Sequence, residues 1–224
     1  QRGLAYEFGR AFEDELNKKL KTGNARVNVV FVALPRDLLA RSLMEGKVDL
    51  VLAQVTIRPE LQAKVDFTNP TRSNVSEVVV TGPGATAIGP EVDLPGKDVY
   101  ARRDSKYHES LVALNGRLTA KGLSPAVIQE IPGNLEDDDV LEMTNAGLIP
   151  ITVFDDYMAE FWKQVFPNLT VHTEVALRTG ANLAVPIRKG SPKLAAELNA
   201  FLAKYGLGTA FGNMLEKRYL VSTK

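Results

Sequence analysis

A basic turn near the middle of the chain has the residue types that bind anions, Arg102-Arg103-Asp104-Ser105-Lys106. It falls where an apolar strand pattern ends and a helical pattern begins. Free N–H groups at a helix N-terminus, with Arg and Lys beside them, bind carboxylates and phosphates. The same residues suit a solvated turn in which the Ser105 hydroxyl caps the helix. The sequence leaves both interpretations open.

An acidic pair, Asp155-Asp156, directly follows the apolar strand pattern Leu148 to Phe154. A carboxylate at the carboxyl end of a parallel strand points into the crevice where α/β sheets bind ligands. A carboxylate one residue further on is well placed to cap the following helix. We therefore expect Asp155 to lie in a ligand crevice and Asp156 to cap a helix that starts at Tyr157.

Two other patterns resemble chemical motifs but have simpler explanations. The segment Gly82-Pro83-Gly84, with Gly89, lacks the Gly-Lys-Ser/Thr of a phosphate loop, and Pro83 removes a backbone donor, so we expect a linker. The acidic run Glu136 to Asp139 lacks the ligand spacing of a calcium loop. Acidic residues favour the first turn of a helix, so we expect a helix to start there.

Neither histidine belongs to a catalytic or metal-binding pattern. His108 lies early in a helical pattern and His172 in a strand pattern, and no nucleophile elbow accompanies them. We expect surface or packing roles for both. The chain has no cysteine, which excludes disulfide frameworks, thiolate zinc sites and cysteine nucleophiles. The sequence therefore implies no metal and no cofactor.

The elements that must position these residues alternate between helix and strand. Leu4, Phe8, Phe12 and Leu16 recur at helical spacing and predict a helix over 4–20. Apolar, β-branched runs predict buried strands over 27–34 and 48–55, with a helix at 35–46 between them. Further along we expect strands over 98–102, 126–131 and 149–154, helices over 105–121, 136–146 and 156–165, apolar runs at 169–176 and 182–187, and helices over 191–205 and 208–218.

This alternation predicts an α/β fold with mostly parallel sheets. Two breaks interrupt it, Thr81 to Ala85 and Arg178-Thr179-Gly180. They suggest two lobes between which the chain crosses twice. A length of 224 residues is enough for two lobes of roughly 100 residues each.

Composition excludes several classes of protein. The 27 basic and 27 acidic residues cancel, whereas a general nucleic-acid binder needs a clustered basic excess. No apolar run approaches the roughly 20 residues that span a bilayer. The chain starts with Gln1 and shows no signal-peptide pattern, so we expect that a segment was removed upstream or that the sequence is a piece of a longer protein.

Several stretches, in order, resemble the type II periplasmic solute-binding proteins of the amino-acid transport family 3. The resemblance covers nearly the whole chain. It implies a two-lobed fold with lobe 1 at 1–80 and 184–224, lobe 2 at 81–183, and linkers near 80–84 and 178–183. The matching stretches are Gly46 to Ala53, Val55 to Glu60, Lys64 to Pro70, Arg102 to Ser110, Gly147 to Asp155, Asn182 to Ser191 and Arg218 to Leu220.

A closer resemblance is to the non-catalytic amino-terminal domain of membrane-bound lytic transglycosylase F-type proteins. Asn134 to Trp162 supports it most. It implies a sensing or regulatory module in the cell envelope, without its own catalytic activity, that captures a small polar ligand in an interlobe cleft. The ligand would be an amino acid, a peptide or a cell-wall fragment, and the partner an attached transglycosylase domain. The alternatives are the binding component of an amino-acid ABC transporter, with a permease as partner, and a related fold with lyase activity in which Asp155 and Glu60 act as acid and base.

The resemblance also implies ligand-binding residues. In the first lobe, Thr56 would contact the ligand and Phe67 would pack near the cleft wall. Amino-acid binders of the family clamp the ligand carboxylate with an Arg where this chain has Leu61. Arg58, three residues earlier, would bind the ligand in its place, with a different geometry. In the second lobe, Arg102, Ser105 and Lys106 would hold an anionic group, and Asp155 a cationic or hydroxyl group. The family has a central strand before the helix at 4–20, and this sequence lacks it.

Overall fold

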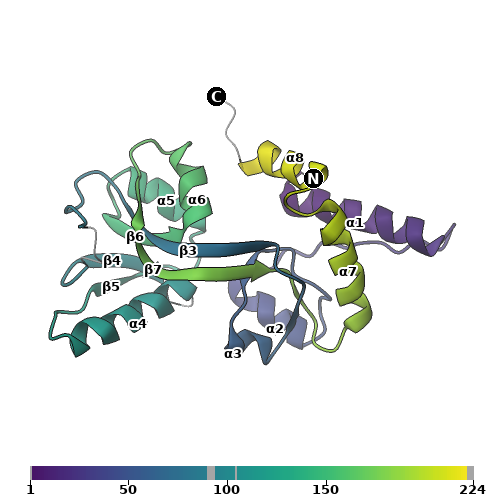
Figure 1. Cartoon of the computed structure of the whole chain (residues 1–224), viewed down its shortest axis with the longest axis horizontal. Helices are drawn as coiled ribbons and strands as arrows, with labels where there is room; N and C mark the ends of the chain where they lie inside the picture. Colours follow the sequence, from purple (N-terminus) through teal and green to yellow (C-terminus); the bar gives the residue numbers. More distant parts are fainter. Residues whose placement is uncertain (1, 90–93, 104, 221–224) are drawn as a thin grey trace. The chain divides into compact units, whose positions relative to one another are not determined.

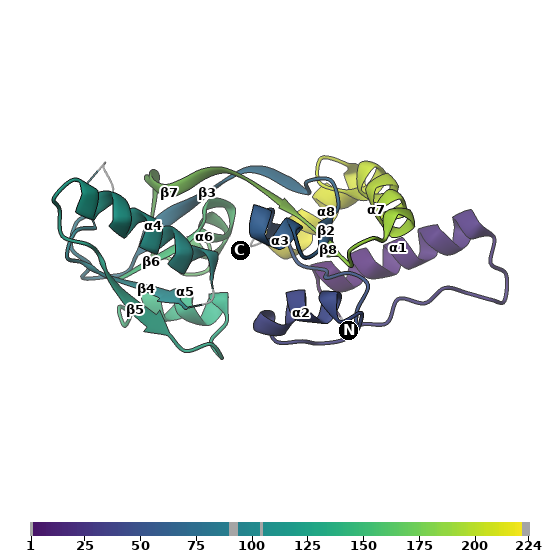
Figure 2. The ribbon, with the colours of Figure 1, turned by 90° about the horizontal axis from the view of Figure 1, so that it is seen from below.

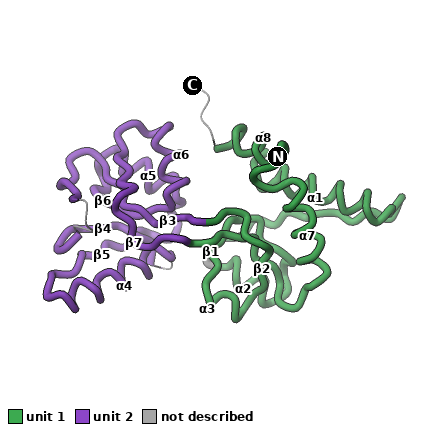
Figure 3. Tube along the Cα trace, viewed as in Figure 1, with its two compact units in different colours: residues 1–73, 181–224 green, residues 74–180 purple. Residues whose placement is uncertain are grey.

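The computed structural model describes residues 2–89, 94–103 and 105–220 (Figure 1). The chain forms two compact units, residues 1–73 with 181–224 and residues 74–180 (Figure 3). It passes from one unit to the other within β3 (Arg72–Thr81) and again near the end of β7 (Thr170–Ala184). Each unit has a hydrophobic core of its own.

The first unit begins with α1 (Leu4–Leu20), the helix that the apolar spacing predicts. Its residue Phe12 is buried and packs edge-on against Phe201 of α7 (Pro192–Tyr205). The expected helix at 35–46 is present as a short 3₁₀ turn followed by α2. This unit also contains η1 (Arg36–Leu38), α2 (Leu39–Met44), β1 (Val55–Thr56), α3 (Pro59–Gln62), β2 (Asp66–Phe67), β8 (Pro186–Ile187) and α8 (Ala210–Leu220).

The segment 27–34 is extended but belongs to no sheet of the described structure, so the prediction of a buried strand there is wrong. It runs back beside α1 (Figure 2). Val30 and Val32 are 79% and 58% exposed. A β-branched run favours an extended backbone, but burial on both faces requires neighbouring strands and covering layers.

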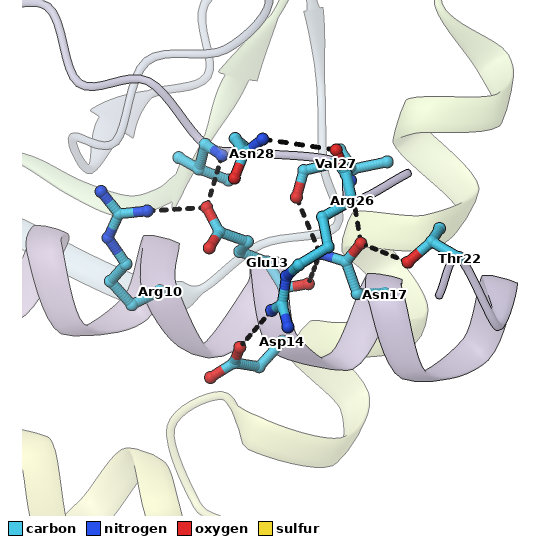
Figure 4. Close-up of polar contacts among 9 residues, drawn as sticks. Arg10, Glu13, Asp14, Asn17, Thr22, Arg26, Val27 and Asn28 are labelled. Carbon is cyan, nitrogen blue, oxygen red and sulfur yellow. Dashed lines mark hydrogen bonds and ion pairs between the residues drawn. The ribbon is translucent and has the colours of Figure 1, made fainter. Parts of the chain in front are cut away.

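Side chains of α1 hold the start of this segment through its backbone (Figure 4). Asn17 accepts a hydrogen bond from the Val27 N–H at 2.8 Å and donates one to the Val27 carbonyl at 2.7 Å. The Glu13 carboxylate accepts a hydrogen bond from the Val29 N–H at 2.6 Å. Both polar side chains are buried, and these contacts satisfy them.

The strand expected over 48–55 is only partly present. β1 covers Val55–Thr56 and pairs with β7, and Leu50 forms an isolated bridge with Ile187. The Val51 N–H donates to the Pro186 carbonyl at 2.9 Å.

The second unit is built on three parallel strands, β4 (Asp98–Arg102), β5 (Val127–Ile131) and β6 (Ile151–Asp155). β4 lies between the other two and pairs with both. The intervening helices are α4 (Lys106–Ala120) and α5 (Asp137–Asn145), and α6 (Asp156–Lys163) follows β6. Figure 1 shows α4 on one face of the sheet and α5 and α6 on the other. The predicted βα alternation is confirmed here.

Two long strands make the sheet mixed. Its order is β1-β7-β3-β6-β4-β5, and β3 runs antiparallel to β6. Sequence patterns did not predict β3, and they placed a break at Arg178-Thr179-Gly180 that lies inside β7. Gly180 has φ of 71°, a conformation that glycine adopts readily, so the strand accommodates it without ending.

Candidate functional site

The second unit gathers charged side chains where β4 and β6 end. Arg102 is the last residue of β4 and Asp155 the last residue of β6. Because parallel strands end at the same edge of a sheet, the topology brings both residues to one edge. Lys106 begins the helix after β4, and Asp137 begins the helix after β5. We call these four residues, with Glu77 of β3, the edge cluster.

Lys106 and Asp155 form the central ion pair of the edge cluster. The ammonium Nζ lies 2.6 Å from each of the two Asp155 carboxylate oxygens. The Asp155 side chain is only 6% exposed and that of Lys106 16%. Burial raises the pKa of Asp155, and the charge of Lys106 opposes this shift. Water and salt screen such a pair far less than a surface ion pair. Removing one partner would leave the other charge buried and uncompensated.

Arg102, the second cation of the edge cluster, is bound to the start of α5. Its guanidinium donates to the Asp137 carboxylate at 2.5 Å and to the Leu135 carbonyl at 2.8 Å. The expected helix start at the acidic run is confirmed, and the Glu136 N–H donates to the Asp139 carboxylate at 2.8 Å.

Ser105 caps α4, as one of the two open interpretations predicted. Its hydroxyl accepts a hydrogen bond from the His108 N–H at 3.2 Å and donates one to the Arg102 carbonyl at 2.7 Å. The exposed Arg103 forms a two-fold contact with Glu130 at 2.9 and 2.7 Å. Asp104, the remaining residue of this turn, lies outside the described residues. Ligand binding by Arg102, Ser105 and Lys106 stays a prediction.

Glu77 is the member of the edge cluster that sequence reasoning missed. It faces Asp155 across the β3–β6 pairing and is fully buried. Neither carboxylate oxygen has a hydrogen-bond partner in the described part of the chain. Burial raises the pKa of Glu77, against the nearby Ser110 hydroxyl, which lies outside hydrogen-bond geometry, and the charges of Lys106 and Arg178. The available signal was a single acid in a valine-rich stretch, Val75 to Val80.

The acidic pair is divided between two tasks, with one correction. Helix α6 begins at Asp156, so Asp155 and not Asp156 occupies the N-cap position. The Asp155 side chain makes no capping bond, because its carboxylate is held by Lys106. Asp156 accepts hydrogen bonds from the N–H groups of Tyr157 at 2.8 Å and Ser76 at 3.1 Å. Asp156 therefore fixes β3 to the start of α6.

The candidate residues of the first unit lie on short elements. Thr56 is buried in β1, and half-buried Arg58 precedes α3, where its carbonyl accepts from the Leu61 and Gln62 N–H groups. Phe67 and Leu61 both pack against the core formed by Leu43, Val51 and Val65. Leu61 therefore has a packing role, and no contact of Thr56, Arg58 or Phe67 tests ligand binding.

A cavity of about 130 Å³ lies within the first unit, lined mainly by apolar side chains of α1, α7 and α8. Arg72 and Glu216 reach its wall and form an ion pair at 2.6 Å. Sequence patterns gave no indication of this cavity, because residues far apart in the chain line it.

Metal and histidine chemistry find no support in the described residues. Among them, no group of three or more His, Asp or Glu side chains is arranged to hold a metal ion. His172 hydrogen-bonds to the Thr81 hydroxyl at 2.9 Å, which fits the packing role expected for it.

No helix in the described ranges has the length and apolar character needed to cross a bilayer.

Residues 1–217 match the bacterial extracellular solute-binding proteins, family 3. The chain belongs to this family. Family 3 proteins are periplasmic or associated with the cell envelope. The predicted recognition and the two-lobed type II fold are thereby confirmed.

Two curated relatives of this family 3 protein differ in role. The L-arginine-binding protein of Pseudomonas aeruginosa is 26% identical over 88% of this chain and 71% of its own length. The membrane-bound lytic murein transglycosylase F of Ectopseudomonas mendocina is 25% identical over 97% of this chain, but the chain spans only 41% of its length.

The fold also matches solved structures. A binding component of an ABC transporter from Wolinella succinogenes, solved in complex with lysine, superposes with a TM-score of 0.75. The two are 18% identical, and the match covers 99% of this chain and 87% of the other. This likeness establishes the fold alone.

Proposed function

We propose that this chain is an envelope solute-binding module that captures a small polar ligand and serves as the non-catalytic sensing domain of a lytic transglycosylase-like protein. Membership in family 3 supports solute binding. The transglycosylase F relative, matched over 97% of this chain, supports the regulatory role. The observation that carries the proposal is the edge cluster, which gathers charged groups at the carboxyl ends of β4 and β6.

An amino acid, a peptide or a cell-wall fragment would suit such a module. Asp155 would interact with a polar or cationic group of the ligand, and Arg102, Ser105 and Lys106 with an anionic one. Thr56, Arg58 and Phe67 would contribute from the first lobe. An attached transglycosylase domain is the proposed partner.

The second candidate is the substrate-binding component of an amino-acid ABC transporter, with a permease as partner. The L-arginine-binding relative favours it, because the chain covers 71% of that protein. Leu61 argues against it, because its side chain packs in the core and offers no charge to a ligand carboxylate.

A thermal-shift screen with amino acids, dipeptides and soluble cell-wall fragments tests the proposal. A ligand at about 100 times its Kd adds about 2.7 kcal/mol, a shift of about 5 °C or more for a chain of this size. Shifts with cell-wall fragments alone would favour the sensing role, and shifts with free amino acids the transport role.

Two variants give the screen its control. Asp155→Asn should abolish the shift, because it removes the charge at the edge of the sheet. Asp138→Asn should leave the shift unchanged, since Asp138 is exposed. A ligand shift that survives Asp155→Asn, or no shift with any compound, would count against the proposed function.

A further inference from the structure

The Asp155 carboxylate is already paired with Lys106. The Lys106 ammonium contacts both Asp155 oxygens at 2.6 Å, the arrangement in which a carboxylate receives a primary amine. Lys106 Nζ also lies 5.2 Å from the centroid of the Tyr107 ring. The hydroxyl of the same tyrosine accepts a hydrogen bond from the Asp155 N–H at 3.3 Å. The carboxylate is thus occupied by a cation from its own chain.

The charges of the edge cluster are already matched. Lys106 faces Asp155, and Arg102 faces Asp137, so each cation has a carboxylate partner. Burial further disfavours an ionised Glu77. A second ammonium brought to Asp155 would therefore compete with Lys106 for one carboxylate.

This competition is unequal. A tethered group acts at an effective concentration of millimolar or more, whereas a free ligand must displace it at its own concentration. The Lys106 side chain is also mostly buried. A ligand that displaced it from Asp155 would leave the Lys106 ammonium without its carboxylate and close to the charge of the ligand. A ligand without a free amino group does not compete with Lys106 for Asp155 and does not displace it.

Building on the proposed function, we propose that Lys106 is a built-in occupant of Asp155 that determines specificity. Its ammonium takes the position of a ligand amino group. The module therefore selects polar ligands whose amino group is acylated, such as an N-acylated amino acid or peptide, over the free amino acid.

Chemical rescue tests the occupancy directly. In Lys106→Ala, n-butylammonium at about 10 mM should raise Tm by a few degrees relative to the same concentration of sodium chloride, because it restores the lost cation. Wild type should show no such rise. The double variant Lys106→Ala/Asp155→Asn, which lacks the carboxylate, should not respond either. An equal rise in wild type, or none in a folded Lys106→Ala, would overturn the proposal.

Calorimetric titration with L-glutamine and Nα-acetyl-L-glutamine tests the selectivity. Wild type should bind the acetylated form at least about 10-fold more tightly, and Lys106→Ala should reverse this preference. If Lys106→Ala is too unstable to purify, Lys106→Gln serves, because its amide places no charge on Asp155. Wild-type binding of the free form with equal or greater affinity would overturn the proposal. Binding of neither form by either protein would count against an amino-acid-derived ligand, and so against the proposed function, while the rescue experiment still decides the role of Lys106.

Discussion

At the scale of single residues, Glu77 makes the sharpest prediction. Its carboxyl is fully buried and without a hydrogen-bond partner in the described structure. Burial raises its pKa above the ordinary value of 4.5. Glu77→Gln keeps the shape and removes the ionisable group. We expect this variant to be more stable than wild type at pH 7, by on the order of 1 kcal/mol.

The pH dependence of this gain follows from the direction of the pKa shift. Below about pH 4.5 the carboxyl is protonated in both the folded and the unfolded chain, so the two proteins should differ little. As the pH rises, the unfolded chain releases the proton first, and wild type loses stability until the pH passes the raised pKa. Urea unfolding of both proteins from pH 4 to 8 measures the difference in the free energy of unfolding. A difference that is constant with pH would contradict the prediction.

At the scale of elements, the contact between α1 and the segment 27–34 contributes to the stability of the first unit. Asn17 satisfies both the N–H and the carbonyl of Val27, and its oxygen also accepts from the Thr22 hydroxyl at 2.7 Å. Asn17→Ala should destabilise the protein by about 1–3 kcal/mol, because it leaves partly buried backbone groups without partners.

Asn28 provides the matched control on the same segment. It is exposed, and its amide makes one 3.3 Å bond to the Arg26 carbonyl. Asn28→Ala should change the free energy of unfolding by less than about 0.5 kcal/mol. Equal effects of the two substitutions in urea unfolding would show that Asn17 does not hold the segment.

At the scale of the whole molecule, the proposed function predicts closure on ligand. Two strands, β3 and β7, connect the units, and the chain changes unit between residues 73 and 74 and between residues 180 and 181, where we expect the hinge rotation. A saturating ligand from the screen should therefore reduce the radius of gyration in solution scattering. Asp155→Asn at the same ligand concentration should keep the larger value. Unchanged dimensions of wild type at saturation would refute closure.

The sequence alone determined most of the second unit and the order of its elements. Strand 98–102 and helix 4–20 have the bounds that their patterns predict, because short-range periodicity sets them. The placement of Arg102, Lys106 and Asp155 at strand and helix ends was equally local, since it follows from where apolar runs stop.

The tertiary structure decided which side chains and which strands pair with each other. The contact of Lys106 with Asp155 joins residues 49 positions apart, and that of Arg102 with Asp137 residues 35 apart. Glu77 became part of the site only through the β3–β6 register. The segment 27–34 has the composition of a buried strand, yet it lies outside every described sheet, because strand formation needs a neighbour that local sequence does not supply.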